Sequence, residues 1–544
     1  WEAFLHKVEA MKAHWSRRHA LGAGLLVPAA GVAVPWSALA QAALAQSALA
    51  QAAPAQAAPV ELGGPEPFSF ERLIVQAQQL AQRPYEQRPV VPQWLSDLSP
   101  QQYRTIRYRP ERAIPLGGSA FSVQLFHLGS YHRQPVRIFL VEEGSARQVL
   151  YDPALFDFGP VRLPETPAKD SGFAGFRVHH VFQEGGPPQE LMTFLGASYF
   201  RAAARDTGFG ISARGLALET GLGRPEEFPV FTDFWIFRPN DPKDPLQICA
   251  LLDSPSVAGA YRFDVAPRDG TLVGVDASLF FRSDVSQVGI APLTSMYFFG
   301  PNDRLGVDDR RGEVHDSEGL SIWRATGEAV WRPLVNPSEL RISVFTDDNP
   351  RGFGLLQRQR VYSAYGDLQA LFHQRPNLWV EPKGAWGKGS VRLIEIPIVD
   401  ETHDNIVAFW TPEAPVTAGS ELRVAYSLLW SLQPPLETGL ILVLGTSIGL
   451  GGEPGGDRPA ESRRVAIEFG PPGGNLPQGG LPEVVVECHN GECSPAVLSP
   501  NAATGGWQVM FDVRPGGEAV ELRCYLTQEG RAISETWLYR LDNS

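Results

Sequence analysis

The chain has 544 residues, a net charge of -13 and a pI near 5.4, so it is too long for one ordinary domain and too acidic for a nucleic-acid binder, which needs a basic face. A hydrophobic content of 43% supports large cores, and 54 glycines and 47 prolines among many short apolar runs favour a β-rich fold over a helical bundle. These quantities predict two folded units behind a leader and fit a soluble protein or one that handles neutral polymers.

Residues 1–65 are expected to be a targeting segment followed by a linker. Met11 is a candidate initiator, and Arg17-Arg18 precede a weakly apolar run that ends in the cleavage-like Ala38-Leu39-Ala40. This order is typical of a bacterial twin-arginine export signal and predicts a periplasmic protein. A cytosolic tail with a chance arginine pair is the alternative. Two prolines interrupt the apolar run, so no membrane span is expected, and the ALAQ and APAQ repeats are typical of a flexible linker.

The remaining chain begins with an amphipathic pattern and continues as many short strands. The apolar spacing of Phe68–Glu86 predicts a helix, and a polar connector follows to about Gln101. Alternating β-branched and aromatic residues between Gly, Pro and Asp turns then predict a large antiparallel β-sandwich over 66–432. A Gly- and Pro-rich break over 433–481 leads into more strands, so a second, Ig-like domain is expected over 433–544, with LILVLGTSI in the break as a candidate first strand.

Four cysteines are present, and two of them lie close together in the sequence. Cys488 and Cys493 flank His-Asn-Gly-Glu, and Asn490-Gly491 is a hairpin signal, so the two thiols are expected to face each other across a turn. In an oxidising periplasm this arrangement predicts a disulfide. A zinc site is disfavoured because one His and two Cys leave the tetrahedron incomplete. Cys249 and Cys524 are expected to be buried thiols.

Residues 375–410 combine aromatic rings with carboxylates in one short span. The stretch contains Trp379, Trp386 and Trp410 together with five Asp and Glu residues. Flat rings offer a face to sugar C–H groups, and paired carboxylates are the acid and base of glycosidic cleavage. The alternative is a Trp-rich β core next to a charged exposed turn. The chain has no phosphate loop, no zinc helix and no ligand-like His cluster, so neither a metal nor a cofactor is expected.

Several blocks of the sequence resemble one known family. They are GFAGFRV (172–178), LGASYFRA (195–202), GISARGLALET (210–220), EEFPVFTDFWIFRP (226–239), ALLDSPSVAGAYRF (250–263), APLTSMYFFGPN (291–302), HDSEGLSI (315–322) and NPRGFGLLQR (349–358). These blocks are similar to the periplasmic osmoregulated glucan biosynthesis proteins of the OpgG/OpgD (MdoG/MdoD) family. The resemblance covers about 68–541, and the twin-arginine leader makes the chain more similar to the OpgD branch.

The resemblance implies both a fold and an activity. The implied fold is a galactose-mutarotase-like β-supersandwich with a long cleft, followed by an Ig-like domain. The implied substrate is linear β-1,2-glucan, cut by an endo-β-1,2-glucanase with inversion at the anomeric carbon. Two alternatives stay open, which are a transglycosylase that makes cyclic β-1,2-glucan and a non-catalytic glucan-binding scaffold of the periplasmic assembly machinery. A homodimer is the expected oligomeric state.

The resemblance also implies site residues. The Asp of its E-T-x-D-N motif, the general acid, is Asp404 here, and the Asp of its H-D-S motif, the general base, is Asp316. Glu401 matches the motif glutamate and is expected to support the acid. Carboxylates near Asp404 are expected to raise its pKa so that it carries a proton near neutral pH. Five further residues are candidate substrate contacts, each with core packing or simple solvation as the alternative: Trp379, Trp386, Lys383, Arg358 and Tyr199.

Overall fold

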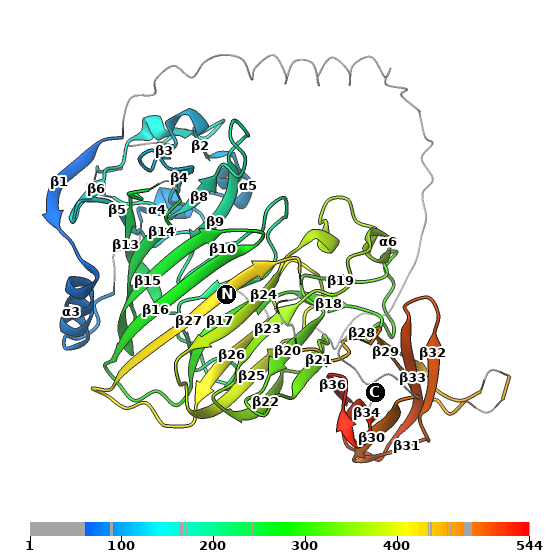
Figure 1. Ribbon diagram of the computed structural model, residues 1–544. Coiled ribbons are helices and arrows are strands. Elements are labelled where there is room, and N and C mark those ends of the chain that lie inside the picture. Colours follow the sequence, from blue (N-terminus) through cyan, green and yellow to red (C-terminus); the bar gives the residue numbers. More distant parts are fainter. Residues whose placement is uncertain are drawn as a thin grey trace, which may run out of the picture. The chain divides into compact units, whose positions relative to one another are not determined.

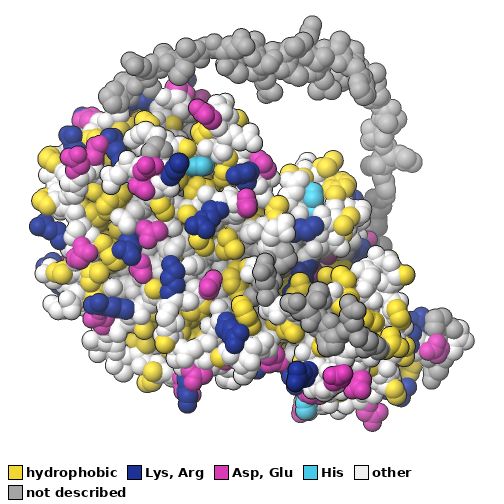
Figure 2. Space-filling model, viewed as in Figure 1, with side chains coloured by type: hydrophobic (Ala, Val, Ile, Leu, Met, Phe, Trp, Pro, Cys, Tyr) yellow, Lys and Arg dark blue, Asp and Glu magenta, His cyan; other side chains and the backbone are white. Residues whose placement is uncertain are grey.

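The computed structural model describes residues 60–87, 91–163, 167–169, 171–241, 243–433, 435, 438–453, 455–456, 458–472 and 481–542. The predicted export signal and most of the linker lie outside these residues. Among the described helices, none is long and apolar enough to cross a membrane. On the face of the molecule shown in Figure 2, acidic and basic side chains are intermixed.

The predicted N-terminal helix is confirmed as α3 (Phe70–Ala81). Ser69 caps it by accepting the Arg72 N–H at 3.3 Å, and Leu73 and Ala77 are fully buried on its inner face. The polar connector contains two short helices that the sequence did not indicate, α4 (Gln93–Ser96) and α5 (Pro100–Thr105). Pro100 starts α5 because proline fits the first helical position.

Two large sheets form most of the molecule (Figure 1). In spatial order, the 16-stranded sheet contains β1 (Leu62–Pro67), β6 (Ser145–Val149), β5 (Arg137–Glu142), β13 (Val230–Phe237), β14 (Leu246–Asp253), β15 (Val257–Pro267), β16 (Thr271–Phe281), β27 (Glu421–Ser431), β24 (Asn377–Lys383), β23 (Gly352–Leu356), β20 (Gly319–Trp323), β21 (Ala329–Pro333), β36 (Thr536–Leu541), β34 (Val520–Gln528) and β30 (Glu483–His489), with β35 (Arg531–Ala532) beside β34. The 11-stranded sheet contains β22 (Arg341–Asp348), β25 (Lys388–Glu395), β26 (Ile406–Pro412), β17 (Val288–Ser295), β11 (Ser212–Arg214), β10 (Tyr199–Ala202), β9 (Gln189–Leu195), β8 (Gly175–His180), β4 (Phe121–Phe126) and β3 (Ile114–Pro115), with β12 (Ala217–Leu218) beside β17.

Smaller elements complete the described chain. They are the strand pairs β18 (Tyr297–Phe299) with β19 (Val314–His315) and β2 (Arg107–Tyr108) with β7 (Phe156–Asp157), the helix α6 (Tyr362–Tyr365), and the short helical turns η2 (Pro110–Arg112), η3 (Pro153–Leu155) and η4 (Phe372–Gln374).

Strand alternation produces the main core, as the sequence pattern predicts. In β16, Val273, Val275 and Ala277 are buried while the residues between them are partly exposed. Their side chains belong to one apolar cluster with residues of the opposite sheet, such as Val123 and Phe176. The molecule is therefore an all-β sandwich, which confirms the predicted fold class.

Two strand pairs differ from the predicted antiparallel order. β5 lies parallel to β13, and β21 lies parallel to β36. Both pairs join segments that are far apart in the sequence, and such long-range parallel neighbours leave no hairpin signal between them.

The C-terminal strands form a second sandwich. A five-stranded sheet contains β28 (Val443–Leu450), β29 (Arg463–Phe469), β33 (Gly506–Pro515), β31 (Gly491–Cys493) and β32 (Val497–Asn501). Its residues share a core with β34 and β36 of the long sheet, for example Ile467 and Phe511 with Leu522 and Trp537. The candidate first strand is confirmed as β28. The Gly- and Pro-rich break expected over 433–481 is shorter than predicted, because β29 also lies within it. The domain boundaries at 66, 432 and 433 stay predictions.

The predicted hairpin at Asn490-Gly491 is wrong. Asn490 does take the left-handed conformation that favours this sequence, with φ 64°. The flanking strands, however, do not pair with each other: β30 pairs with β34 in one sheet, and β31 pairs with β33 in the other. The turn therefore carries the chain between the two layers of the sandwich.

Candidate functional site

Asp316 lies in the turn between β19 and β20, next to the end of β17. Its N–H donates to the carbonyl of Met296 at 2.8 Å, and the hydroxyl of Ser317 lies 2.7 Å from that of Ser295. The Asp316 side chain is only 4% exposed. The segment that follows β17 therefore determines where this carboxylate lies.

Asp404 is held to the same segment from the other side. The next residue, Asn405, is fully buried and donates its N–H to the carbonyl of Ser295 at 3.0 Å. The Asn405 side chain accepts from the Tyr297 N–H at 2.8 Å and donates to the Tyr297 carbonyl at 2.9 Å. Because Asp316 bonds to the residue between these two, one short stretch of backbone brings both aspartates together.

The surroundings of the two carboxyl groups differ. Burial, together with the negative charge of Asp316, raises the pKa of Asp404 to about 6, against the opposing charges of Arg214, Arg201 and Arg375. Burial also raises the pKa of Asp316, but Arg375 opposes this rise by forming a direct ion pair with it. Asp404 is thus the group that can carry a proton near neutral pH, while Asp316 has a cation that favours its ionised form.

Tyr199 lies on β10 of the 11-stranded sheet, close enough to Asp404 for that carboxylate to act on its pKa, and its role as a substrate contact stays a prediction. It is the register partner of Arg214, whose guanidinium lies 4.7 Å from the centre of the Tyr199 ring. Arg214 is fixed by an ion pair with Glu226 at 2.6 Å and a hydrogen bond to Thr294 Oγ1 at 3.0 Å. Burial raises the pKa of Tyr199 to about 12, with Glu226 and Asp404 adding to the rise against the charge of Arg214. Its hydroxyl therefore stays a hydrogen-bond donor.

Glu401 supports the loop that carries Asp404. Its two carboxylate oxygens accept from Nη1 and Nη2 of Arg311 at 2.7 and 2.8 Å. Arg311 also donates to Asp309 at 2.8 Å and to Asp367 at 3.2 Å. A single guanidinium, 10% exposed, thus joins three loops of the chain.

The two tryptophans proposed as sugar platforms are not at this site. Trp379 is 4% exposed and packs against the backbone of Gly352 and Gly354, so neither of its faces is open to a ligand. Trp386 is half-buried; its indole N–H donates to the Ala425 carbonyl at 3.2 Å. Trp410 is fully buried. For these rings the alternative interpretation, a Trp-rich core, holds.

The structure gives the side chains of the other two predicted contacts different surroundings. Lys383 is exposed at the far end of β24, eight residues beyond Arg375, which corresponds to about 25 Å of extended chain. The side chain of Arg358 is engaged within the protein. Its guanidinium donates to both oxygens of Glu535 at 2.7 Å and lies 3.5 Å from the centre of the Trp331 ring. The sequence around Lys383 does not indicate in which direction its strand runs. The sequence around Arg358 does not indicate its distant partner Glu535.

Cys488 and Cys493 lie in contact as free thiols. Burial, followed by a hydrogen bond to Cys488, raises the pKa of Cys493. The structure thus brings the two sulfurs together across the layers of the C-terminal sandwich, and the disulfide itself stays a prediction. Cys249 and Cys524 are buried, as expected.

Sequence reasoning missed four residues of the site. Asn405 could have been found, because it belongs to the same motif as Asp404. Arg201, Arg311 and Arg375 leave no local signal, since each reaches the aspartates or their loops from a separate element. Within the described ranges, no group of three or more His, Cys, Asp or Glu side chains is arranged to hold a metal ion.

Comparison with known proteins defines the class. The family model described as periplasmic glucan biosynthesis protein, MdoG, matches residues 68–541. The protein named glucans biosynthesis protein D of Stenotrophomonas maltophilia (strain K279a) is 44% identical over 489 residues, covering 88% of this chain and 90% of its own. Its namesake in Xanthomonas axonopodis pv. citri (strain 306) is also 44% identical, over 492 residues, 88% of this chain and 91% of its own.

The chain therefore belongs to the MdoG family of periplasmic glucan biosynthesis proteins. Among its relatives, those described as glucans biosynthesis protein D share nearly the whole length of the described fold, which agrees with the predicted resemblance to the OpgD branch.

Proposed function

We propose that this protein acts in the periplasm as an anomer-inverting endo-β-1,2-glucanase, with Asp404 as general acid and Asp316 as general base. The names of the family and of its relatives support a role in periplasmic glucan biosynthesis. The β-1,2 linkage and the inversion rest on the resemblance of the H-D-S and E-T-x-D-N motifs. The proposal includes export through the twin-arginine signal.

The observation that carries this proposal is the unequal pair of buried carboxyl groups. Cleavage of a glycosidic bond needs one carboxyl that is protonated and a second that is ionised. Asp404 has its pKa raised to about 6, whereas Asp316 is paired with Arg375. In the proposed reaction, Asp404 donates its proton to the leaving glycosidic oxygen. Asp316 accepts a proton from the attacking water, directly or through a relay.

Three further groups have defined tasks in this mechanism. The charges of Arg201 and Arg214 limit the rise in the pKa of Asp404, so that it can release its proton during the reaction. The neutral hydroxyl of Tyr199 is available as a hydrogen-bond donor beside Asp404. Each of these residues is held on a strand of the 11-stranded sheet, which gives the site a rigid wall.

The test is to incubate the mature protein with linear β-1,2-glucan in ¹⁸O-labelled water and to analyse the products by mass spectrometry. Short linear fragments that carry one ¹⁸O are expected. Cyclic products without the added water would indicate cyclising transfer through the same aspartates instead of hydrolysis. An unchanged polymer that still binds would contradict enzymatic activity and favour the scaffold alternative.

Variants assign the roles. Asp404→Asn and Asp316→Asn are each expected to lower kcat by at least about a thousandfold, since each removes a proton-transfer group. Glucan binding, measured by calorimetry, should change little. Glu339→Gln, an exposed carboxylate in the 336–340 turn, is the matched control and should keep full activity. Appreciable activity in either aspartate variant would contradict the role given to that residue.

A further inference from the structure

A second basic region lies on the 11-stranded sheet, which also carries Arg201 and Arg214 beside the aspartate pair. A cavity of about 670 Å³ opens between α5, β2 and the edge of the 11-stranded sheet. We call it the arginine cavity, because its lining includes Arg104, Arg107, Arg109 and Arg177 against only two carboxylates, Glu111 and Asp157. Such an excess of cations is notable in a chain with a net charge of -13.

Two of the four guanidinium groups are fixed by the protein. Arg177 donates to Gln124 Oε1 at 2.8 Å and pairs with Glu190 at 3.2 Å. Arg109 donates to the carbonyl of Phe156 at 3.1 Å, while its distance to Glu111 is 3.9 Å. These groups are therefore held in place beside the cavity.

The other two guanidinium groups, those of Arg104 and Arg107, are exposed and have no ion pair or hydrogen bond with another described residue. Arg107 lies opposite Asp157 in the β2–β7 pair, but the Asp157 carboxylate accepts the Gly159 N–H at 3.0 Å instead of pairing with it. Planar guanidinium groups without partners are the groups that proteins use to bind phosphate and carboxylate.

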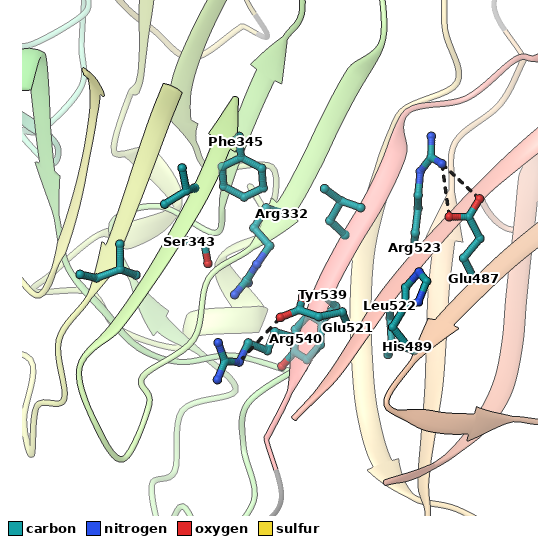
Figure 3. A pocket seen from close by; sticks show the side chains of 13 residues that line it. Arg332, Ser343, Phe345, Glu487, His489, Glu521, Leu522, Arg523, Tyr539 and Arg540 are labelled. Carbon is teal, nitrogen blue, oxygen red and sulfur yellow. Dashed lines mark hydrogen bonds and ion pairs between the residues drawn. The ribbon is translucent and has the colours of Figure 1, made fainter. Parts of the chain in front are cut away.

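A second cavity shows the opposite arrangement. It has a volume of about 400 Å³ and lies between β22 and the strands β30, β34 and β36 (Figure 3). Each of its arginines pairs with a carboxylate of the protein: Arg332 with Glu395 at 3.2 Å, Arg523 with Glu487 at 3.1 Å and Arg540 with Asp542 at 3.4 Å. This second cavity therefore has no comparable demand for an anion, and the contrast favours a ligand in the arginine cavity.

A continuous row of side chains links the arginine cavity to the aspartate pair. Gln124, Arg177, Thr193 and Arg201 are successive register partners on the neighbouring strands β4, β8, β9 and β10. Direct partners point to the same face of a sheet, and neighbouring strands are about 4.8 Å apart. Arg177 of the cavity is thus about 10 Å from Arg201, whose charge acts on both aspartates.

We propose that the arginine cavity binds an anionic group, a phosphate or carboxylate substituent, on a glucan chain that also reaches the aspartate pair. Arg104 and Arg107 contact the oxyanion, the protein-bound Arg177 and Arg109 border it, and the partly exposed Ile106 and Leu195 accommodate the neighbouring sugar. This inference rests on the proposed function for the identity of the polymer, but not for its cleavage.

The test compares two glucans and is independent of catalysis. Calorimetric titrations use the Asp404→Asn protein, so that the polymer stays intact, with linear β-1,2-glucan either unmodified or carrying carboxymethyl or phosphate groups. Tighter binding of both modified glucans is expected, by about tenfold at low salt, with the difference shrinking as salt rises. Equal affinity for modified and unmodified glucan would overturn the inference, even if the proposed cleavage is established.

Arginine variants then locate the effect. In the same background, Arg104→Ala/Arg107→Ala is expected to remove the preference for the modified glucans. The matched control, Arg268→Ala/Arg531→Ala, removes two exposed arginines outside the arginine cavity, one just after β15 and one in β35, and should keep this preference. An equal loss of affinity for modified and unmodified glucan in the first variant would contradict anion recognition. Free inorganic phosphate or acetate, added at the same concentration as the substituents on the glucan, should not displace the modified glucan. Complete displacement would contradict a site for a group carried by the polymer.

Discussion

At the residue scale, the proposed chemistry depends on how the surroundings distinguish two aspartates of the same intrinsic acidity. Both are buried, and burial disfavours the charged form of each. The direct ion pair with Arg375 compensates Asp316, whereas Asp404 experiences the charge of Asp316 in addition to its own burial. The proposed division into acid and base rests on this asymmetry.

The first prediction concerns the pH dependence of kcat/KM. Asp404 must be protonated to act as an acid, so activity should fall as the pH rises through about 6, the pKa of that group. Asp316 must be ionised, so activity should also fall at acidic pH. Because Arg201 favours the charged form of Asp404, Arg201→Gln should raise that pKa and move the alkaline limb up by about half a pH unit or more.

Steady-state kinetics between about pH 4 and 9 measure both limbs. Arg205→Gln, four residues further along the chain, is the matched control, because its guanidinium lies over Phe182 and is not among the main charges that act on either aspartate. An alkaline limb that does not move in Arg201→Gln would argue against Asp404 as the titrating acid.

At the element scale, loops rather than strands decide the position of Asp404, the proposed acid. Arg311 joins the loop before β19, the loop after α6 and the loop that carries Asp404. Arg311→Lys keeps the charge but loses the two-pronged contact with Glu401. We expect kcat to fall by about tenfold or more with little change in KM, because substrate binding is left to other groups.

The matched control is the neighbouring Arg310→Lys. The guanidinium of Arg310 donates to the carbonyl of Gly366 at 2.7 Å and contacts no carboxylate of the Asp404 loop. Its kcat should stay close to that of the native chain. Comparable losses in both variants would show that general loosening of these loops, and not the Arg311–Glu401 contact, controls the acid.

The third prediction is the disulfide between the layers of the C-terminal sandwich. Oxidation of the purified protein should join Cys488 to Cys493 and lower the mass by about 2 Da, because the two thiols are already in contact. A loop this short should stabilise the protein by about 2 kcal/mol in the chain-entropy model. Peptide mapping and urea unfolding check this, with Cys249→Ser as the control. A cross-link involving Cys524 instead would contradict the pairing.

At the scale of the whole molecule, the long sheet continues into the second sandwich, and a buried ion pair lies where they meet. Glu535 is fully buried, and its carboxylate accepts hydrogen bonds from the Val443 N–H at 2.8 Å and from both Nη1 and Nη2 of Arg358. Arg358 thus connects β23 of the first core to the strands of the second.

Removing this arginine should be costly. Arg358→Ala leaves the Glu535 carboxylate buried without its cation, so we expect the free energy of unfolding to fall by about 3–5 kcal/mol. The double variant Arg358→Ala/Glu535→Gln should recover part of that loss, because no uncompensated charge remains. Urea denaturation of the three proteins measures the difference, and a cost below about 1 kcal/mol for Arg358→Ala would contradict a structural role for the pair.

The sequence by itself determined the all-β class, the N-terminal helix and the C-terminal sandwich, and it named Asp316 and Asp404 as candidates for the proposed acid and base. These features rest on local properties: strand alternation, helical spacing and intact motifs of a few residues. Asp316, Asp404 and Glu401 could be named because each motif carries its own pattern in a short span.

Only the tertiary structure decided what surrounds those residues. Trp379 and Arg358 looked like ligand contacts but are committed to packing and to Glu535, whereas Arg201, Arg311 and Arg375 reach the aspartates or their loops from separate elements. The physical reason is that pKa values, burial and ion pairs depend on distances in space. Pairing between strands that are remote in sequence sets those distances, and no local pattern encodes that pairing.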